Sequence, residues 1–87
     1  MKKWKMSLAD ATARTLAKRL KWYEENTPGY PGELDSLDVW KYKLRTMREA
    51  FELIARDNGT WLFTPEEEIK VERGLNEFRH YFFALWT

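Results

Sequence analysis

The stretch that decides the fold is DSLDVWKYKLRTMREAFELIARD, residues 35–57 of an 87-residue chain. Its large apolar side chains recur at alternating steps of three and four residues, which is the spacing of one face of an α-helix: Leu37, Trp40, Leu44, Met47, Phe51 and Ile54. Asp35, with Asp38 three residues later, predicts the start of the helix, and the Asp-Asn-Gly run at 57–59 contains residue types that end one. We therefore expect a helix over about residues 36–57 whose apolar face receives a neighbouring helix.

A helix is also expected before this stretch. Ser7 and Asp10 have the spacing of a capping box. A narrow stripe of mostly small residues follows, which would let another backbone approach closely: Ala9, Ala13, Leu16, Ala17, Leu20 and Tyr23. The run NTPGYPG at 26–32 contains two prolines and two glycines, which interrupt helices. The sequence thus predicts a first helix over about residues 7–25.

The third helix has the clearest start signal. Thr64 can act as N-cap, Pro65 suits the first helical position, and the acidic residues that follow interact favourably with the helix dipole. We expect this helix to continue to about residue 86. Gly74 inside it costs about 1 kcal/mol relative to alanine, so we expect it to serve the close approach of a neighbouring backbone or a ligand.

The end of the third helix is aromatic on nearly every side. Two partner helices of about 20 residues cannot enclose it, and the chain carries 14 aromatic residues among 87. The sequence therefore predicts an interface between copies of the chain, made by Gly74, Phe78, Tyr81, Phe82 and Trp86. The expected fold is all-α: one domain over residues 1–87, a compact three-helix up-down-up bundle that forms a homo-oligomer, dimer or higher, through its C-terminal helix.

Composition excludes several functions. The chain has no cysteine and a single histidine, His80, so thiol chemistry, zinc-thiolate sites and catalytic triads have no residues to use. A net charge of +1 is too small for a dedicated duplex nucleic-acid binder. Neither an export signal nor a membrane-spanning apolar run is recognisable. We expect a cytoplasmic, non-enzymatic protein that needs no cofactor and no metal.

Charge is unevenly distributed, with seven basic residues and one acidic residue in positions 1–21, and eight basic against thirteen acidic in positions 22–87. Basic residues of the first two helices lie near aromatic ones, a combination that holds phosphates and stacks bases. The predicted ligand-binding residues are Arg14, Lys18, Trp22, Tyr30, Trp40, Arg45 and Arg48. The competing interpretation is that these cations lie on ordinary solvated faces and pair with the acids of the third helix. Tyr30 either folds over a pocket or plugs the end of the bundle.

Affinity arithmetic limits such a site. A base stacked on one exposed ring contributes about 1–3 kcal/mol, whereas nanomolar binding needs about 12 kcal/mol. An 87-residue bundle has no room to enclose a dinucleotide, so two or more copies would have to frame the cavity.

The sequence resembles a small family of proteins encoded by tailed bacteriophages. The resemblance rests on the Gly-Tyr-Pro turn at 29–31, on Trp40 followed by Met47 and Ala50-Phe51, and on a C-terminal Gly-Leu pair with later Tyr-Phe and Leu-Trp pairs. It implies a phage protein acting in the cytoplasm of an infected bacterium, and it supplies no catalytic residues. In size and aromatic content the chain is also similar to phage proteins that sequester the nucleotide signals of bacterial immune systems such as Thoeris and CBASS.

Two hypotheses of different class follow. In the first, a homo-oligomer captures a small anionic nucleotide immune signal of the cyclic-nucleotide or cyclic ADP-ribose type. In the second, the aromatic surface around Tyr81 and Trp86 binds and inhibits a host defence or metabolic enzyme. A structural or assembly role in the virion is a further alternative.

Overall fold

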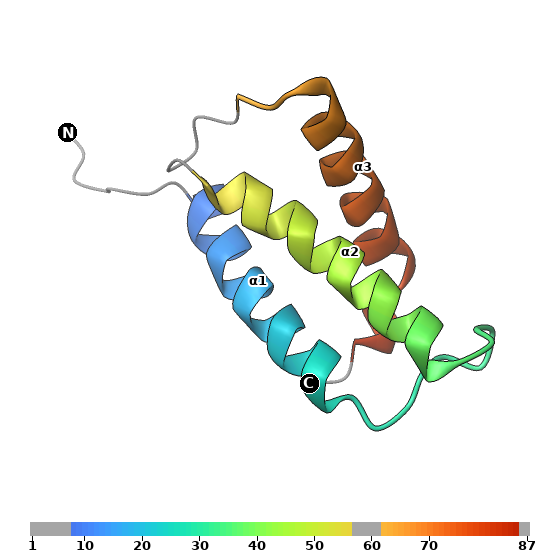
Figure 1. Ribbon diagram of the computed structural model, residues 1–87. Helices are drawn as coiled ribbons and strands as arrows, with labels where there is room; N and C mark the ends of the chain where they lie inside the picture. Colours follow the sequence, from blue (N-terminus) through green and yellow to red (C-terminus); the bar gives the residue numbers. More distant parts are fainter. Residues whose placement is uncertain (1–7, 57–61, 86–87) are drawn as a thin grey trace.

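A computed structural model of the chain describes residues 8–56 and 62–85. These residues form three α-helices, α1 (Leu8–Asn26), α2 (Leu37–Ala55) and α3 (Pro65–His80), followed by the short 3-10 helix η2 (Phe82–Ala84). No β-strand occurs in either described range. Consecutive helices run in opposite directions, so the predicted all-α class and up-down-up order are confirmed (Figure 1).

The middle helix, α2, organises the other two. It packs along both α1 and α3, whereas α1 and α3 make no comparable contact with each other over the described residues. Figure 1 shows α2 lying between its two neighbours. Most of the predicted apolar seam is buried, with Leu44 and Met47 completely inaccessible to solvent. The chain is therefore a layer of three packed helices centred on α2.

The start of α2 differs from the prediction by one residue. Ser36, rather than Asp35, is the N-cap: its backbone is extended and its hydroxyl accepts a hydrogen bond of 3.2 Å from the Val39 amide. The predicted spacing of three residues between cap and amide is correct, but it begins at Ser36. At the other end α2 stops at Ala55, and the predicted stop signal at 57–59 lies outside the described residues.

The first helix ends at Asn26, one residue beyond the prediction, and its predicted cap, Ser7, lies outside the described residues. Its small-residue stripe is the buried face, since Ala13 and Ala17 are almost fully enclosed. Small side chains at these positions let α1 lie close to α2, as the sequence predicts.

The third helix begins as predicted and ends early. Thr64 caps it and forms a complete capping box with Glu67, whose carboxylate also receives two hydrogen bonds from Arg56. The Arg56 side chain and the Thr64 backbone amide lower the pKa of Glu67 to about 2. The prediction of a helix as far as residue 86 is wrong, because α3 stops at His80 and Tyr81 leaves the helical conformation with φ −104° and ψ 16°.

Tyr81 leaves the helix in a position where its ring packs into the core. Its ring lies edge-on to Trp40 with centroids 5.4 Å apart, and Tyr81 is 8% exposed. On the other side of Trp40, the Tyr23 ring of α1 is also edge-on, at 6.4 Å. The C-terminal aromatic residues are thus covered in part by their own chain, which the expectation of an all-round aromatic helix did not include.

Gly74 supplies the close approach between α3 and α2. It is buried, and a Cβ atom placed on it would lie 2.6 Å from the Thr46 carbonyl oxygen and closer still to the Ala50 Cβ. The neighbouring backbone that approaches Gly74 is that of α2 in the same chain, at Thr46 and Ala50.

Replacement of Gly74 by alanine tests this packing. We expect Gly74→Ala to lower the free energy of unfolding by about 1–3 kcal/mol, because the α2 backbone must move to admit the methyl group. This loss outweighs the gain of about 1 kcal/mol that alanine brings to a helix. Urea denaturation followed by circular dichroism measures it. Gly32→Ala is the control, since a Cβ at Gly32 meets no atom within 4 Å. A more stable Gly74→Ala variant would contradict the assignment.

Candidate functional site

The predicted ligand-binding residues divide between two places. Arg14 and Lys18 line a groove between α1 and α2, and Trp22 is exposed on the same helix one turn beyond Lys18. Arg45 and Arg48 lie along the same α1–α2 boundary. Tyr30 and Trp40 instead line a hollow at the end of the helices. The structure therefore does not bring the seven residues together into one site.

We call the first place the basic groove. Its hollow has a volume of about 440 Å³, and its described lining is four cations, one carboxylate and two alanines: Arg14, Lys18, Lys21, Arg56, Glu52, Ala17 and Ala55. Ala17 and Ala55 have short side chains, so space remains between the longer cationic side chains of the groove. Arg56 is already bound to Glu67, but the other cations still outnumber the one carboxylate of the lining, which makes the groove an anion-attracting surface.

Lys18 and Lys21 supply the ammonium groups available to a ligand. Both are exposed on α1, and neither forms a hydrogen bond or ion pair with another described residue. Trp22, 58% exposed, follows Lys18 by four residues and so lies next to it on the helix surface. An anion with an attached ring system could contact the lysines and the indole together.

Beyond the groove, Glu24 holds both predicted arginines of α2. One of its carboxylate oxygens accepts two hydrogen bonds from Arg45, at 2.9 and 3.1 Å, and the other accepts one from Arg48 at 3.3 Å. Arg48 also donates to Glu52 at 2.9 Å. Partial burial disfavours the charged form of Arg48, but the hydrogen bond to Glu52 and the charges of both carboxylates outweigh it and raise the pKa of the guanidinium.

Both predicted arginines of α2 are engaged in ion pairs within the chain. Sequence reasoning left open whether they pair with the acids of the third helix, and the structure shows that they pair with Glu24 of α1 and Glu52 of α2 instead. Arg45 and Arg48 are therefore bound to carboxylates and do not line the basic groove, whereas Arg14 and Lys18 do.

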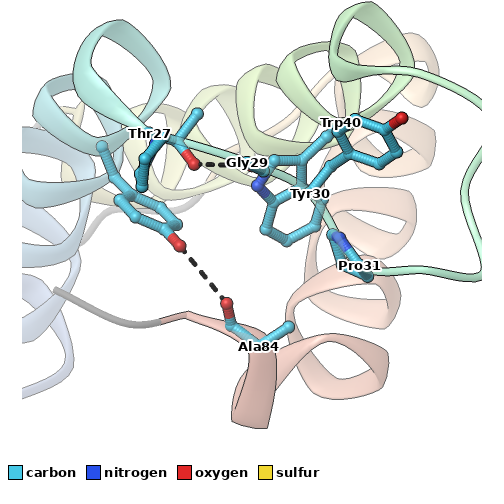
Figure 2. A pocket seen from close by; sticks show the side chains of 8 residues that line it. Thr27, Gly29, Tyr30, Pro31, Trp40 and Ala84 are labelled. Carbon is cyan, nitrogen blue, oxygen red and sulfur yellow. Dashed lines mark hydrogen bonds between the residues drawn. The ribbon is translucent and has the colours of Figure 1, made fainter.

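The second place, which we call the aromatic hollow, has a volume of about 250 Å³. Residues lining it include Tyr23, Thr27, Tyr30, Pro31, Trp40 and Ala84. Figure 2 shows the open space between Thr27 at the end of α1, Trp40 from α2 and Ala84 from η2. Tyr30 lines this space and is 46% exposed, a position compatible with both of its predicted roles.

The residues of the predicted oligomer interface also have separate positions. Gly74 and Tyr81 are buried inside the chain, and Phe78 packs edge-on against Phe51 with centroids 5.0 Å apart. Phe82 is half exposed and its neighbour Phe83 is 90% exposed. Trp86 lies outside the described residues. Phe82 and Phe83 thus form the exposed part of this aromatic region.

Sequence reasoning left two groove residues out of the predicted site. They are Lys21 and Arg56. Arg56 follows Arg48 and Glu52 at steps of four, so the helical spacing along the flank of the α2 seam was the signal that could have identified it.

Within residues 8–56 and 62–85, no three histidine, aspartate or glutamate side chains are grouped so that they could hold a metal ion. None of the described helices has the length and apolar character needed to cross a membrane. Comparisons with protein-family models, with curated proteins and with solved structures found no match to this chain.

Neutralisation of Glu24 tests its ion pairs with Arg45 and Arg48. We expect Glu24→Gln to lower the free energy of unfolding by about 1–2 kcal/mol, because the Glu24 side chain is only 12% exposed and two guanidinium groups lose their shared anion. Thermal or urea unfolding measures the change. Glu25→Gln is the matched control, since it removes the same charge from the adjacent exposed position. Equal stabilities of the two variants would contradict a role for the pairing.

Proposed function

We propose that this chain binds and sequesters a small anionic nucleotide, with the phosphates in the basic groove and the base on Trp22. The observation that carries the proposal is the convergence of Arg14, Lys18 and Lys21 around one hollow of about 440 Å³, which Arg56, itself bound to Glu67, also lines. Ammonium and guanidinium groups are the standard protein partners of phosphate oxygens. Since Lys18 and Lys21 form no ion pair with described residues, a phosphate can bind them without displacing a carboxylate.

The position of Trp22 supports a nucleotide over a simple anion. Its ring is more than half exposed and lies one helical turn from Lys18. An exposed indole offers a face on which a base can stack, for about 1–3 kcal/mol. In the phage setting that the sequence resemblance implies, the ligand is a bacterial immune signal of the cyclic-nucleotide or cyclic ADP-ribose type, and the protein acts against host defence.

Assembly of two or more copies is part of the proposal. Tight capture requires that nearly all of a nucleotide be buried, and a groove on the face of a three-helix layer buries one side of it. A second copy would cover the other side. Phe82 and Phe83 are exposed beside Phe78, and such aromatic side chains are common at the centre of protein interfaces.

Isothermal titration calorimetry with a panel of cyclic dinucleotides and cyclic ADP-ribose isomers tests ligand binding. We expect saturable binding of at least one compound, weakening as salt concentration rises. The double variant Lys18→Glu/Lys21→Glu should weaken it at least about tenfold, because two charge-assisted contacts are lost. Arg73→Glu/Arg79→Glu changes the net charge equally on exposed positions of α3 and should bind as the wild type does. An absence of heat with every compound would overturn the proposal.

Light scattering after size exclusion tests the assembly. We expect more than one copy per particle for the wild type, and a single copy for Phe83→Ser, which removes the 90% exposed ring and leaves Phe82 in its contact with Phe78. The exposed rings of Phe82 and Phe83 also favour the second candidate function, inhibition of a host protein. A single-copy wild type that recovers one bacterial protein in stoichiometric amount from lysate would replace the sequestration proposal with that one.

A further inference from the structure

The aromatic hollow has a chemistry opposite to that of the basic groove. We propose that it binds a small organic cation of the quaternary-ammonium kind, as a site separate from the proposed nucleotide site. Three electron-rich rings line it, those of Tyr23, Tyr30 and Trp40, and no charged side chain is among its described lining residues. Rings of this kind attract a positive charge placed over their faces.

The polar atoms at the hollow also favour a positive ligand. The Thr27 hydroxyl donates to the Gly29 carbonyl at 2.8 Å, so its proton is already engaged. The Ala84 carbonyl oxygen accepts from the Tyr23 hydroxyl at 3.4 Å, a long hydrogen bond (Figure 2). Carbonyl oxygens carry partial negative charge and attract a cation.

The charged residues near the hollow also favour a positive ligand. Seven of its eight lining residues come from positions 22–40. This segment contains neither lysine nor arginine, although Lys21 and Lys41 flank it, and it contains five acidic residues: Glu24, Glu25, Glu33, Asp35 and Asp38. Glu24 is bound to Arg45 and Arg48, the Glu33 carboxylate lies 3.4 Å from the His80 ring, and Lys43 is paired with Glu77 at 3.0 Å. The acids Glu25, Asp35 and Asp38 outnumber the two flanking lysines, which favours a cation over a phosphate at this end of the helices.

A cation already contacts the adjoining ring in the same aromatic cluster. The Lys43 ammonium lies 5.7 Å from the centroid of Tyr81, whose ring also packs edge-on against Trp40. This contact is within the range of a cation–π interaction. A ligand cation in the hollow would make the same type of contact mainly with the exposed Tyr30 ring, while Tyr23 and Trp40, 5% and 1% exposed, form the wall behind it.

The volume limits the size of the ligand. About 250 Å³ is slightly below the range of about 300–1,000 Å³ typical of pockets for drug-sized molecules. Trp40 and Tyr23 are buried and held by packing, while Tyr30 stands half exposed on the connector between α1 and α2. Two fixed walls and one outer ring suit a compact head group such as trimethylammonium.

Choline and its neutral isostere 3,3-dimethyl-1-butanol distinguish a cation site from a merely apolar one, because they have nearly the same shape and differ in charge. We expect choline to produce a saturable shift of the assigned Trp40 indole N–H signal in NMR titrations, and to bind about five- to thirtyfold more tightly than the alcohol. Equal binding of the two, or no saturable shift with choline, would overturn the proposal.

Two tyrosine variants locate the binding. Tyr30→Ala should weaken choline binding about fivefold or more, and Tyr30→Phe should retain most of it because the ring face remains. Tyr42→Ala is the matched control: Tyr42 is a similarly exposed tyrosine, 58% against 46%, that does not line the hollow. Circular dichroism verifies that each variant is folded. Equal loss in Tyr30→Ala and Tyr42→Ala, or no loss in either, would contradict binding in the hollow.

The groove variant Lys18→Glu/Lys21→Glu makes the two proposals separable, since choline binding should survive it while nucleotide binding is lost. A lipid head group carries the same cation next to a phosphate, which Glu25, Asp35 and Asp38 would repel, so we propose the free cation as ligand. Sedimentation with phosphatidylcholine vesicles tests this: we expect the protein to stay in the supernatant, and co-sedimentation would overturn the choice of the free cation.

Discussion

The indole of Trp40 is held edge-on between two tyrosine rings, and the rest of the arrangement depends on this contact. Trp40 is 1% exposed, with Tyr23 of α1 on one side and Tyr81 after α3 on the other. Each such aromatic pair contributes about 0.5–1.5 kcal/mol beyond the burial of its area. One side chain of the middle helix thereby fixes both outer helices at this end of the molecule.

The same contact explains why α3 ends where it does. For its ring to reach Trp40, Tyr81 adopts a non-helical conformation, and the chain then turns into η2. This turn places Ala84 against the end of the helices, where its carbonyl faces Tyr23. The aromatic hollow is thus a consequence of core packing, since Tyr23 and Trp40, which line it, also hold the helices together.

The basic groove and the aromatic hollow lie at different positions along α1. At 1.5 Å per residue along α1, Arg14 at the far end of the basic groove is about 20 Å from Thr27 at the aromatic hollow, and Lys21 at the near end is about 9 Å from it. The Debye length at physiological ionic strength is about 8 Å, so the charge of Arg14 has little effect at the hollow, whereas that of Lys21 is screened only in part. The two surfaces therefore adjoin along α1, in a chain with a net charge of only +1.

The order of residues along the chain was enough to predict the helices, because periodicity and caps act over three or four residues. The apolar spacing from Leu37 to Ile54 and the capping box at Thr64 depend on local geometry alone. Packing between distant residues settled the rest. Trp40 was buried by a tyrosine 41 positions later, the end of α3 followed from that burial, and Glu24 rather than an acid of α3 paired with Arg45 and Arg48. A local sequence pattern predicts a helix and its apolar face, but it does not specify which residues of another helix that face contacts. Those partners depend on which helix faces pack together. The small residues Gly74 and the α1 alanines determine this packing, because they let the helices approach closely.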